Sequence, residues 1–113
     1  MINGFEKYTY ELNEYESNVC EIIVSKLRSN IGESKAVKNV EMRNKLESMG
    51  YKLQPARMRK IISFIRTNHL INNLVSTSKG YYVATKRQEV EKYIESLQQR
   101  INRIEVVKQS FKL

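Results

Sequence analysis

Two short segments in the middle of this chain carry apolar residues at helical spacing, and only a few residues separate them. Two segments rich in strand-forming residues follow. Asn39 is expected to cap the first helix, which is marked by Val40, Met42 or Arg43, Leu46 and Met49, with both methionines expected in the core. Gly50 follows where a left-handed C-terminal residue is expected. Pro55 then suits the first position of a helix over residues 55–67, because proline lacks the N–H that this position leaves unpaired. A helix pair joined this tightly restricts the folds open to the chain.

The helix predicted over residues 55–67 has one apolar side. Met58, Ile61, Ile62 and Ile65 follow the i, i+3, i+4, i+7 spacing and are expected to point inward. Leu53 precedes the helix and is placed to pack on Met58. The opposite side of this helix is therefore free to carry function.

Two further elements are predicted before this pair. Asn13 and Glu16 form a capping-box pattern that opens a helix over about residues 14–29, followed by a connection with a minimal strand at residues 36–37. Residues 8–12 alternate in polarity, which fits an edge strand or a docked arm.

The segment after residue 67 predicts a β-hairpin and a long helix. Residues 70–75 and 81–83 are rich in strand formers, and residues 76–80 form the turn. Tyr81 and Tyr82 point to opposite faces, so we expect one in the core and the other exposed, without choosing between them. Thr85 with Gln88 is expected to cap the last helix.

Helix, helix, helix, hairpin, helix is the order of a winged helix-turn-helix domain with an added C-terminal helix. The fold class expected is therefore α+β, mostly α. We divide the chain into an N-terminal arm at 1–12, a winged helix-turn-helix domain at 13–85 and a C-terminal helix at 86–113.

Positive charge is concentrated in this predicted domain. No Asp or Glu lies between residues 48 and 88, while that stretch holds eight Lys and Arg residues, equal to the whole formal net charge of +8. An acid-free basic block in an otherwise neutral chain indicates a surface for a polyanion.

The predicted DNA-binding residues lie on the third helix and the hairpin. Arg59, Lys60 and Ser63 are the candidates for base edges in a major groove, and Ala56 allows close approach. Lys52, Arg57 and Arg66 are expected to hold phosphates. The complete predicted set is Lys52, Gln54, Ala56, Arg57, Arg59, Lys60, Ser63, Arg66, Thr67, Ser78 and Lys79.

The C-terminal helix carries apolar residues at alternating four- and three-residue steps. This pattern fits either a dimer seam or a face packed on the chain's own domain. Because two half-sites are read together by a two-fold dimer, we expect a homodimer. The predicted seam is Val90, Ile94, Leu97, Ile101 and Ile104.

The sequence offers little for catalysis. With one His, one Cys and no Asp, we expect no enzyme activity, no metal site and no cofactor, and no small-molecule substrate is evident. No apolar run reaches membrane-spanning length, and the first ten residues lack the apolar stretch of a signal peptide, so a cytoplasmic protein is expected.

Four segments also resemble a known group of proteins. Residues 53–62, Ile65-Arg66, residues 78–83 and residues 91–97 with Arg100 and Ile101 are similar to small winged helix-turn-helix DNA-binding proteins of tailed bacteriophages and prophages. The resemblance covers residues 39–104 and implies DNA binding in phage transcription control or replication initiation, in the bacterial cytoplasm. Gln54 departs from the pattern, because related helices often begin with a Ser, Thr or Asp cap.

Two other functions remain open. A winged helix can instead bind an acidic host or phage protein, for example as an inhibitor of a host defence enzyme. It can also bind structured RNA through the shape of its backbone. The leading prediction is sequence-specific binding of double-stranded DNA, with the helix at 55–67 in the major groove and the hairpin on the backbone.

Overall fold

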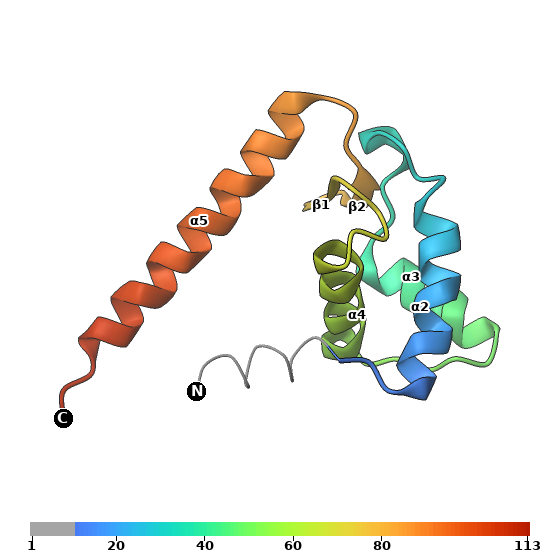
Figure 1. The fold of residues 1–113 in the computed structure, drawn as a ribbon, viewed down its shortest axis with the longest axis horizontal. Helices are drawn as coiled ribbons and strands as arrows, with labels where there is room; N and C mark the ends of the chain where they lie inside the picture. The colour runs from blue at the N-terminus through green and yellow to red at the C-terminus, as the bar shows by residue number, and fades with distance from the viewer. Residues whose placement is uncertain (1–10) are drawn as a thin grey trace.

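The computed structural model describes residues 11–113, which form four α-helices, one short 3-10 helix and one two-stranded antiparallel sheet. The fold is α+β and mostly helical, with the elements in the predicted order (Figure 1). The predicted pattern at residues 8–10 lies outside the described residues. No helix in residues 11–113 is long and apolar enough to cross a membrane.

Helix α2 spans Glu14–Leu27 and begins with the predicted capping box. The Asn13 side chain accepts from the Glu16 N–H at 2.8 Å, and the Glu16 carboxylate accepts from the Asn13 N–H at 3.0 Å. The helix ends two residues before the predicted boundary. The short 3-10 helix η1, at Glu33–Lys35, follows in the connection.

Helix α3, at Asn39–Ser48, and helix α4, at Pro55–Thr67, form the predicted tight pair. Gly50 has a φ of +94°, as expected for the residue that ends α3. Asn39, expected to cap α3, is instead its first residue, and Lys38 with extended backbone is the N-cap, where its N–H donates to the Glu41 carboxylate at 2.8 Å. Met49, expected in the core, is 52% exposed because α3 has already ended there.

The apolar side of α4 is the centre of the core, as predicted. Met58, Ile61, Ile62 and Ile65 are each no more than 1% exposed, and Leu53 is buried beside them. Leu46 of α3 and several residues of α2 complete this cluster. Burial on this scale stabilises the fold by roughly 2 kcal/mol for each large apolar side chain.

Strands β1, at Leu74–Thr77, and β2, at Gly80–Val83, form the hairpin and pair Leu74 with Val83. The turn is shorter than predicted. Val37 forms an isolated bridge to Tyr81, in line with the minimal strand expected there. The prediction that one of Tyr81 and Tyr82 would be exposed is wrong, because they are 8% and 2% exposed. Tyr81 packs in the main core, and Tyr82 packs in a second apolar cluster on the hairpin.

Helix α5, at Arg87–Ser110, provides the cover over Tyr82. The capping pair is Lys86 and Glu89, one residue after the predicted Thr85 and Gln88. The Glu89 carboxylate accepts from the N–H groups of Thr85 and Lys86, both at 3.2 Å, and from the Tyr82 hydroxyl at 3.0 Å. Burial, followed by the bond to Glu89, raises the pKa of Tyr82 to about 12. The beginning of α5 is thus fixed to the hairpin.

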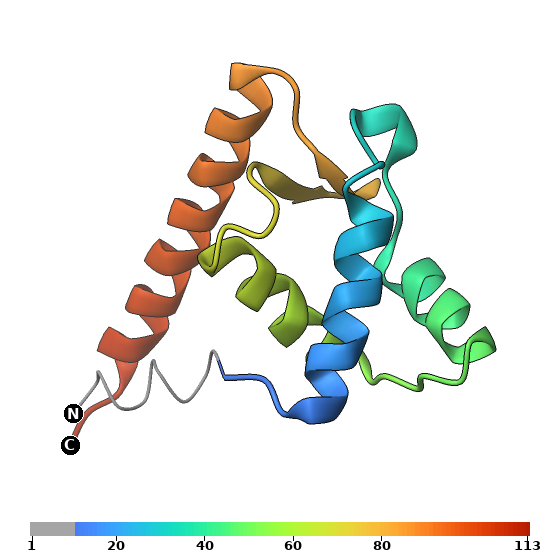
Figure 2. The same ribbon diagram turned by 45° about the vertical axis from the view of Figure 1, so that its right-hand side comes forward.

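Only the first turns of α5 pack on the domain. Val90 and Tyr93 cover Val75, Tyr82 and Ala84, and the helix then leads away so that its C-terminal end lies far from the core (Figure 1). From the side, α5 passes the C-terminal end of α4 (Figure 2). Residues of α4, the hairpin and α5 line one cavity, which is described below.

Candidate nucleic-acid interface

The cations predicted on α4 divide between two sides of the helix. Arg57 and Lys60 turn toward α2, where Glu16 pairs with the Arg57 Nε at 3.2 Å and with the Lys60 Nζ at 3.0 Å. Arg59 lies on the other side and forms no ion pair with any described residue. Lys60, predicted to read bases with Arg59, is thus directed away from it.

Glu16 is a nearly buried carboxylate, with its side chain 3% exposed. Burial alone would raise the pKa of this carboxyl, but the Asn13 N–H, Lys60 and Arg57 together hold the pKa below its ordinary value. The carboxylate therefore stays ionised. It neutralises part of the charge of Arg57 and Lys60, two of the predicted DNA contacts.

Arg66, predicted to hold a phosphate, anchors the hairpin. Its Nε donates to the Leu74 carbonyl and a terminal nitrogen donates to the Ser76 hydroxyl, both at 2.7 Å. Its guanidinium also lies 5.0 Å from the centre of the Tyr93 ring, a distance at which a cation is attracted to the ring. Arg66 thus joins α4, β1 and α5.

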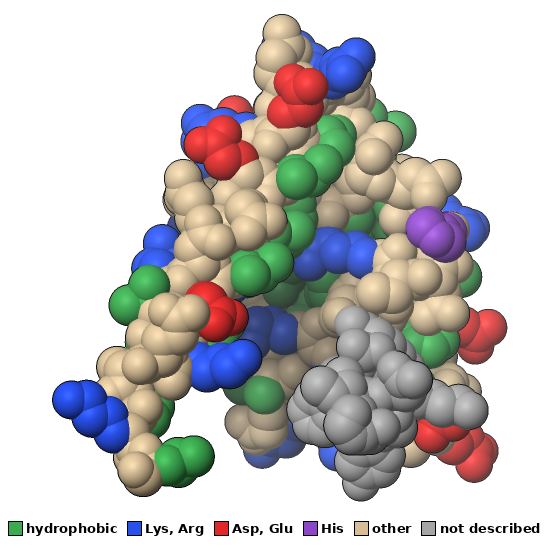
Figure 3. All heavy atoms as spheres, turned by 60° about the vertical axis from the view of Figure 1, so that its left-hand side comes forward, with side chains coloured by type: hydrophobic (Ala, Val, Ile, Leu, Met, Phe, Trp, Pro, Cys, Tyr) green, Lys and Arg blue, Asp and Glu red, His purple; other side chains and the backbone are tan. Residues whose placement is uncertain are grey.

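A cavity of about 680 Å³ opens between α4, the hairpin and α5. Figure 3 shows Lys and Arg side chains within this hollow, beside the hydrophobic side chains that run along α5. The lining residues are Lys38, Asn39, Arg59, Ile62, Ser63, Arg66, Thr67, Ser76, Thr77, Ser78, Gly80, Tyr81, Tyr93, Leu97 and Arg100. All four charged residues in this set are cations.

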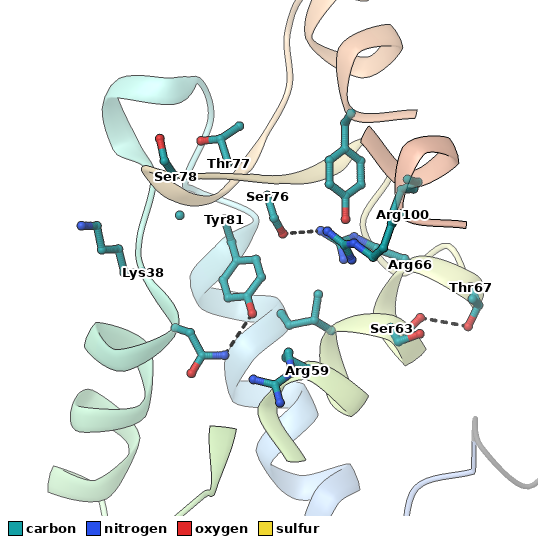
Figure 4. A pocket seen from close by; sticks show the side chains of 15 residues that line it. Lys38, Arg59, Ser63, Arg66, Thr67, Ser76, Thr77, Ser78, Tyr81 and Arg100 are labelled. Atoms are coloured by element: carbon teal, nitrogen blue, oxygen red, sulfur yellow. Dashed lines mark hydrogen bonds between the residues drawn. The ribbon is translucent and has the colours of Figure 1, made fainter. Parts of the chain in front are cut away.

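The structure brings together five of the predicted site residues at this cavity, namely Arg59, Ser63, Arg66, Thr67 and Ser78 (Figure 4). Six others do not line it: Lys52, Gln54, Ala56, Arg57, Lys60 and Lys79. Of these, Lys52, Gln54 and Ala56 are exposed near the beginning of α4, and Lys79 is exposed at the hairpin turn. The predicted set therefore spreads over more than one surface.

Two cations at the cavity were missed by the sequence prediction. Lys38 lies just before α3 and outside the acid-free stretch, with Glu41 close to it in sequence. Arg100 lies on α5, seven residues after Tyr93 and three after Leu97, so helical spacing puts it near their side. This spacing could have indicated that Arg100 lies on the same side of the helix as Tyr93 and Leu97. To place that side at the cavity, the direction in which α5 leaves the hairpin had to be known.

Helix α5 alters the geometry expected for a recognition helix. Ser63 and Thr67 line the cavity from α4, and Leu97 and Arg100 line it from α5. A duplex that approaches the second half of α4 therefore meets α5 as well. The first half of α4, with the exposed Ala56 and Arg59, is the more open part.

The predicted seam of α5 is also divided. Val90 packs on the hairpin cluster and Leu97 lines the cavity, so the beginning of the stripe faces the chain's own domain. Ile94, Ile101 and Ile104 are 58%, 57% and 62% exposed. The packing alternative therefore holds for Val90 and Leu97, while Ile94, Ile101 and Ile104 remain exposed among the described residues.

No protein-family model matches this chain, and neither a curated protein nor a solved structure matches it.

Proposed function

We propose that this chain is a winged helix-turn-helix protein that binds double-stranded DNA as a homodimer. In this proposal α3 and α4 are the helix-turn-helix, β1 and β2 are the wing, and the bridge at Val37 is the short third strand. The surface that contacts DNA is the first half of α4 together with the hairpin turn.

One observation carries the proposal: the first half of α4, the segment before it and the hairpin turn expose cations that pair with no carboxylate. Lys52, Arg59 and Lys79 are exposed and form no ion pair with a carboxylate in residues 11–113. A surface that carries unpaired cations attracts a polyanion. The phosphates of DNA supply such a polyanion.

The contacts divide by their chemistry. Arg59 has a free guanidinium on the open half of α4, and a guanidinium matches the paired acceptors of guanine in the major groove. Lys79 at the hairpin turn and Lys52 before α4 are exposed point charges suited to phosphates. Lys60 and Arg57 contribute less, since Glu16 already neutralises part of their charge.

We extend the proposal to phage or prophage transcription control or replication initiation on the resemblance of residues 53–62 and 78–83 alone. A selection of bound fragments from genomic DNA separates these roles. A palindrome beside a promoter indicates regulation, whereas repeats at an origin indicate replication.

The DNA test compares wild type with Arg59→Gln. We expect wild type to bind a duplex at low salt and to weaken steeply as salt rises, because several counterions are released. Arg59→Gln is expected to bind a selected site at least about tenfold more weakly, the loss of one good base contact. Fluorescence anisotropy at two salt concentrations measures both effects.

Lys92→Gln is the matched control, because Lys92 is exposed on α5, does not line the cavity and loses the same charge. Its affinity should remain within about twofold of wild type, since screening limits the effect of one distant charge. Absence of duplex binding at low salt would refute the proposal, as would an equal loss in both variants.

The dimer part of the proposal is based on the far end of α5. Residues 87–99 contain two cations and three carboxylates, whereas residues 100–113 contain four cations and one carboxylate. An antiparallel pair of α5 helices places these opposite net charges against each other, while a parallel pair places the two cationic ends together. We therefore propose an antiparallel pair that covers Ile101 and Ile104.

Ile101→Glu is expected to dissociate the dimer, because it puts a charge in the middle of the paired apolar stripe. Light scattering at tens of micromolar protein should give twice the chain mass for wild type and the chain mass for the variant. Gln99→Glu adds the same charge on the outer side of α5 and should remain dimeric. A monomeric wild type, or dissociation of both variants, would contradict the proposal.

A further inference from the structure

The cavity between α4, the hairpin and α5 has the dimensions of a small-molecule site. Its volume of about 680 Å³ falls within the range of roughly 300 to 1,000 Å³ that ligand pockets occupy. It is too small to hold a duplex, whose major groove alone is about 12 Å wide. The space exceeds what a single inorganic anion fills, which favours an occupant that also carries an organic part.

Two guanidinium groups from different helices meet at one end of this cavity. Arg66 of α4 and Arg100 of α5 extend toward the same region in Figure 4, and the Arg66 guanidinium lies over the Tyr93 ring. Burial lowers the pKa of Arg66, and the nearby charge of Arg100 lowers it further. The two groups therefore repel each other with no carboxylate from the described residues in the cavity lining.

Arg66 is held in a fixed position while it keeps donors for a ligand. Its bonds to Leu74 and Ser76 use two of the five N–H groups of a guanidinium. The Arg100 side chain is exposed and forms no ion pair with another described residue. Together they offer the forked donors that match the oxygens of a phosphate.

The remaining walls combine hydroxyl groups with apolar surface. The Tyr81 hydroxyl accepts from the Asn39 amide at 3.1 Å, so its own proton remains available to a ligand. Ser63 and Thr67 add two more hydroxyls from α4. Ile62 and Leu97 supply apolar surface. This combination is typical of sites that hold an anionic group at one end and an organic ring at the other.

We propose that this cavity binds a phosphate-bearing small molecule of about mononucleotide size. Its phosphate lies between the guanidinium groups of Arg66 and Arg100, and its organic part lies against Ile62, Leu97 and Tyr81. A bound phosphate relieves the repulsion between the two arginines and ties α5 to α4. The site does not depend on the proposed DNA binding.

The test is a calorimetric titration of the full chain with adenosine monophosphate, guanosine monophosphate and inorganic phosphate at low salt. Wild type is expected to bind at least one mononucleotide at one site per chain and more tightly than inorganic phosphate. Arg100→Gln should weaken that binding at least tenfold. Arg100 is exposed and unpaired, so this variant is expected to fold, which circular dichroism checks.

Arg103→Gln is the matched control, because it removes the same charge three residues further along α5, outside the cavity. It should bind mononucleotide as wild type does. An equal loss in Arg103→Gln would show nonspecific attraction and overturn the proposal, as would no mononucleotide binding at millimolar concentration.

A duplex titrated in parallel separates the two sources of phosphate. If Arg100→Gln weakens duplex binding tenfold and no mononucleotide binds, the arginine pair serves the DNA backbone and the small-molecule site is refuted. If mononucleotide binds through Arg100 and no duplex binds, the small-molecule site stands and the proposed DNA binding fails.

Discussion

Gly80→Ala is expected to destabilise the fold by at least about 3 kcal/mol. A Cβ on residue 80 would lie in direct conflict with the Val37 carbonyl and 2.8 Å from the Lys38 nitrogen, both backbone groups that no side-chain rotation can move. Residue 80 also has a φ of +121°, and holding alanine in such a conformation costs about 1–3 kcal/mol. Urea unfolding followed by circular dichroism measures the change.

The loss extends beyond residue 80 because of the bridge next to it. The Val37 N–H donates to the Tyr81 carbonyl at 3.0 Å, and the Tyr81 N–H donates to the Val37 carbonyl at 2.8 Å. Moving Val37 away from a new Cβ stretches both hydrogen bonds, each of which contributes about 1 kcal/mol. Since domains are stable by only about 5–15 kcal/mol, the variant should be severely weakened.

Gly50→Ala provides the control for this prediction. Gly50 also has a positive φ, of +94°, but a Cβ there would meet nothing within 4 Å. That variant carries the conformational cost alone, about 1–2 kcal/mol. A loss for Gly80→Ala no greater than that for Gly50→Ala would show that the contact with Val37 is unimportant.

Local signals predicted the central elements accurately. Pro55 and the stripe from Met58 to Ile65 predicted α4 with its observed bounds, because proline geometry and helical spacing are both properties of neighbouring residues. The Asn13 and Glu16 capping box was predicted for the same reason. Both features depend on residues only a few positions apart, so the local sequence was enough to predict them.

Apart from the caps of α3 and α5 and the end of α2, the errors concern contacts between distant parts of the chain. Tyr82 is buried because α5 covers it, and Lys60 is paired because Glu16 lies beside it, 44 residues earlier in the chain. No local pattern indicates either contact. The helical wheel of α4 predicted which residues point away from the core, but the neighbour that each one meets depends on the packing of α2.

The cavity could not be predicted for a related reason. Its position depends on the angle at which α5 leaves the hairpin, and the Tyr82–Glu89 hydrogen bond and the contact of Arg66 with Tyr93 hold that angle. The apolar spacing of α5 predicts an apolar stripe, but it does not say which of its residues pack on the domain. In the structure Val90 packs on the hairpin, whereas Ile101 and Ile104 are exposed.

Glu16→Ala is expected to cost about 2–3 kcal/mol at pH 7. It removes the acceptor for the Asn13 N–H and leaves Arg57 and Lys60 without their shared carboxylate. Breaking a fully buried ion pair costs about 3–5 kcal/mol, but the Arg57 and Lys60 side chains are 46% and 35% exposed, so solvent screening reduces the loss. Urea unfolding at a series of pH values measures it.

The pH dependence follows from the lowered pKa of Glu16. Because the carboxyl binds its proton less readily in the folded state, the unfolded chain binds more protons between the two pKa values, and stability there rises with pH. The contribution of Glu16 is complete above its ordinary pKa of 4.5 and is lost as the pH falls through the folded-state value. The difference between wild type and Glu16→Ala should therefore shrink below about pH 4.5.

Two further variants separate the sources of this loss. Glu16→Gln keeps an oxygen that accepts from the Asn13 N–H but has no charge, so its free energy of unfolding should lie between those of wild type and Glu16→Ala. Like Glu16→Ala, it should lack the part of the pH dependence that comes from Glu16. Glu14→Ala removes an exposed carboxylate from the same helical turn, which forms no ion pair with a described residue, and should cost no more than about 1 kcal/mol. A loss that stays constant from neutral to acidic pH, or one that Glu14→Ala reproduces, would mean that the carboxylate between Arg57 and Lys60 does not stabilise the contact between α2 and α4.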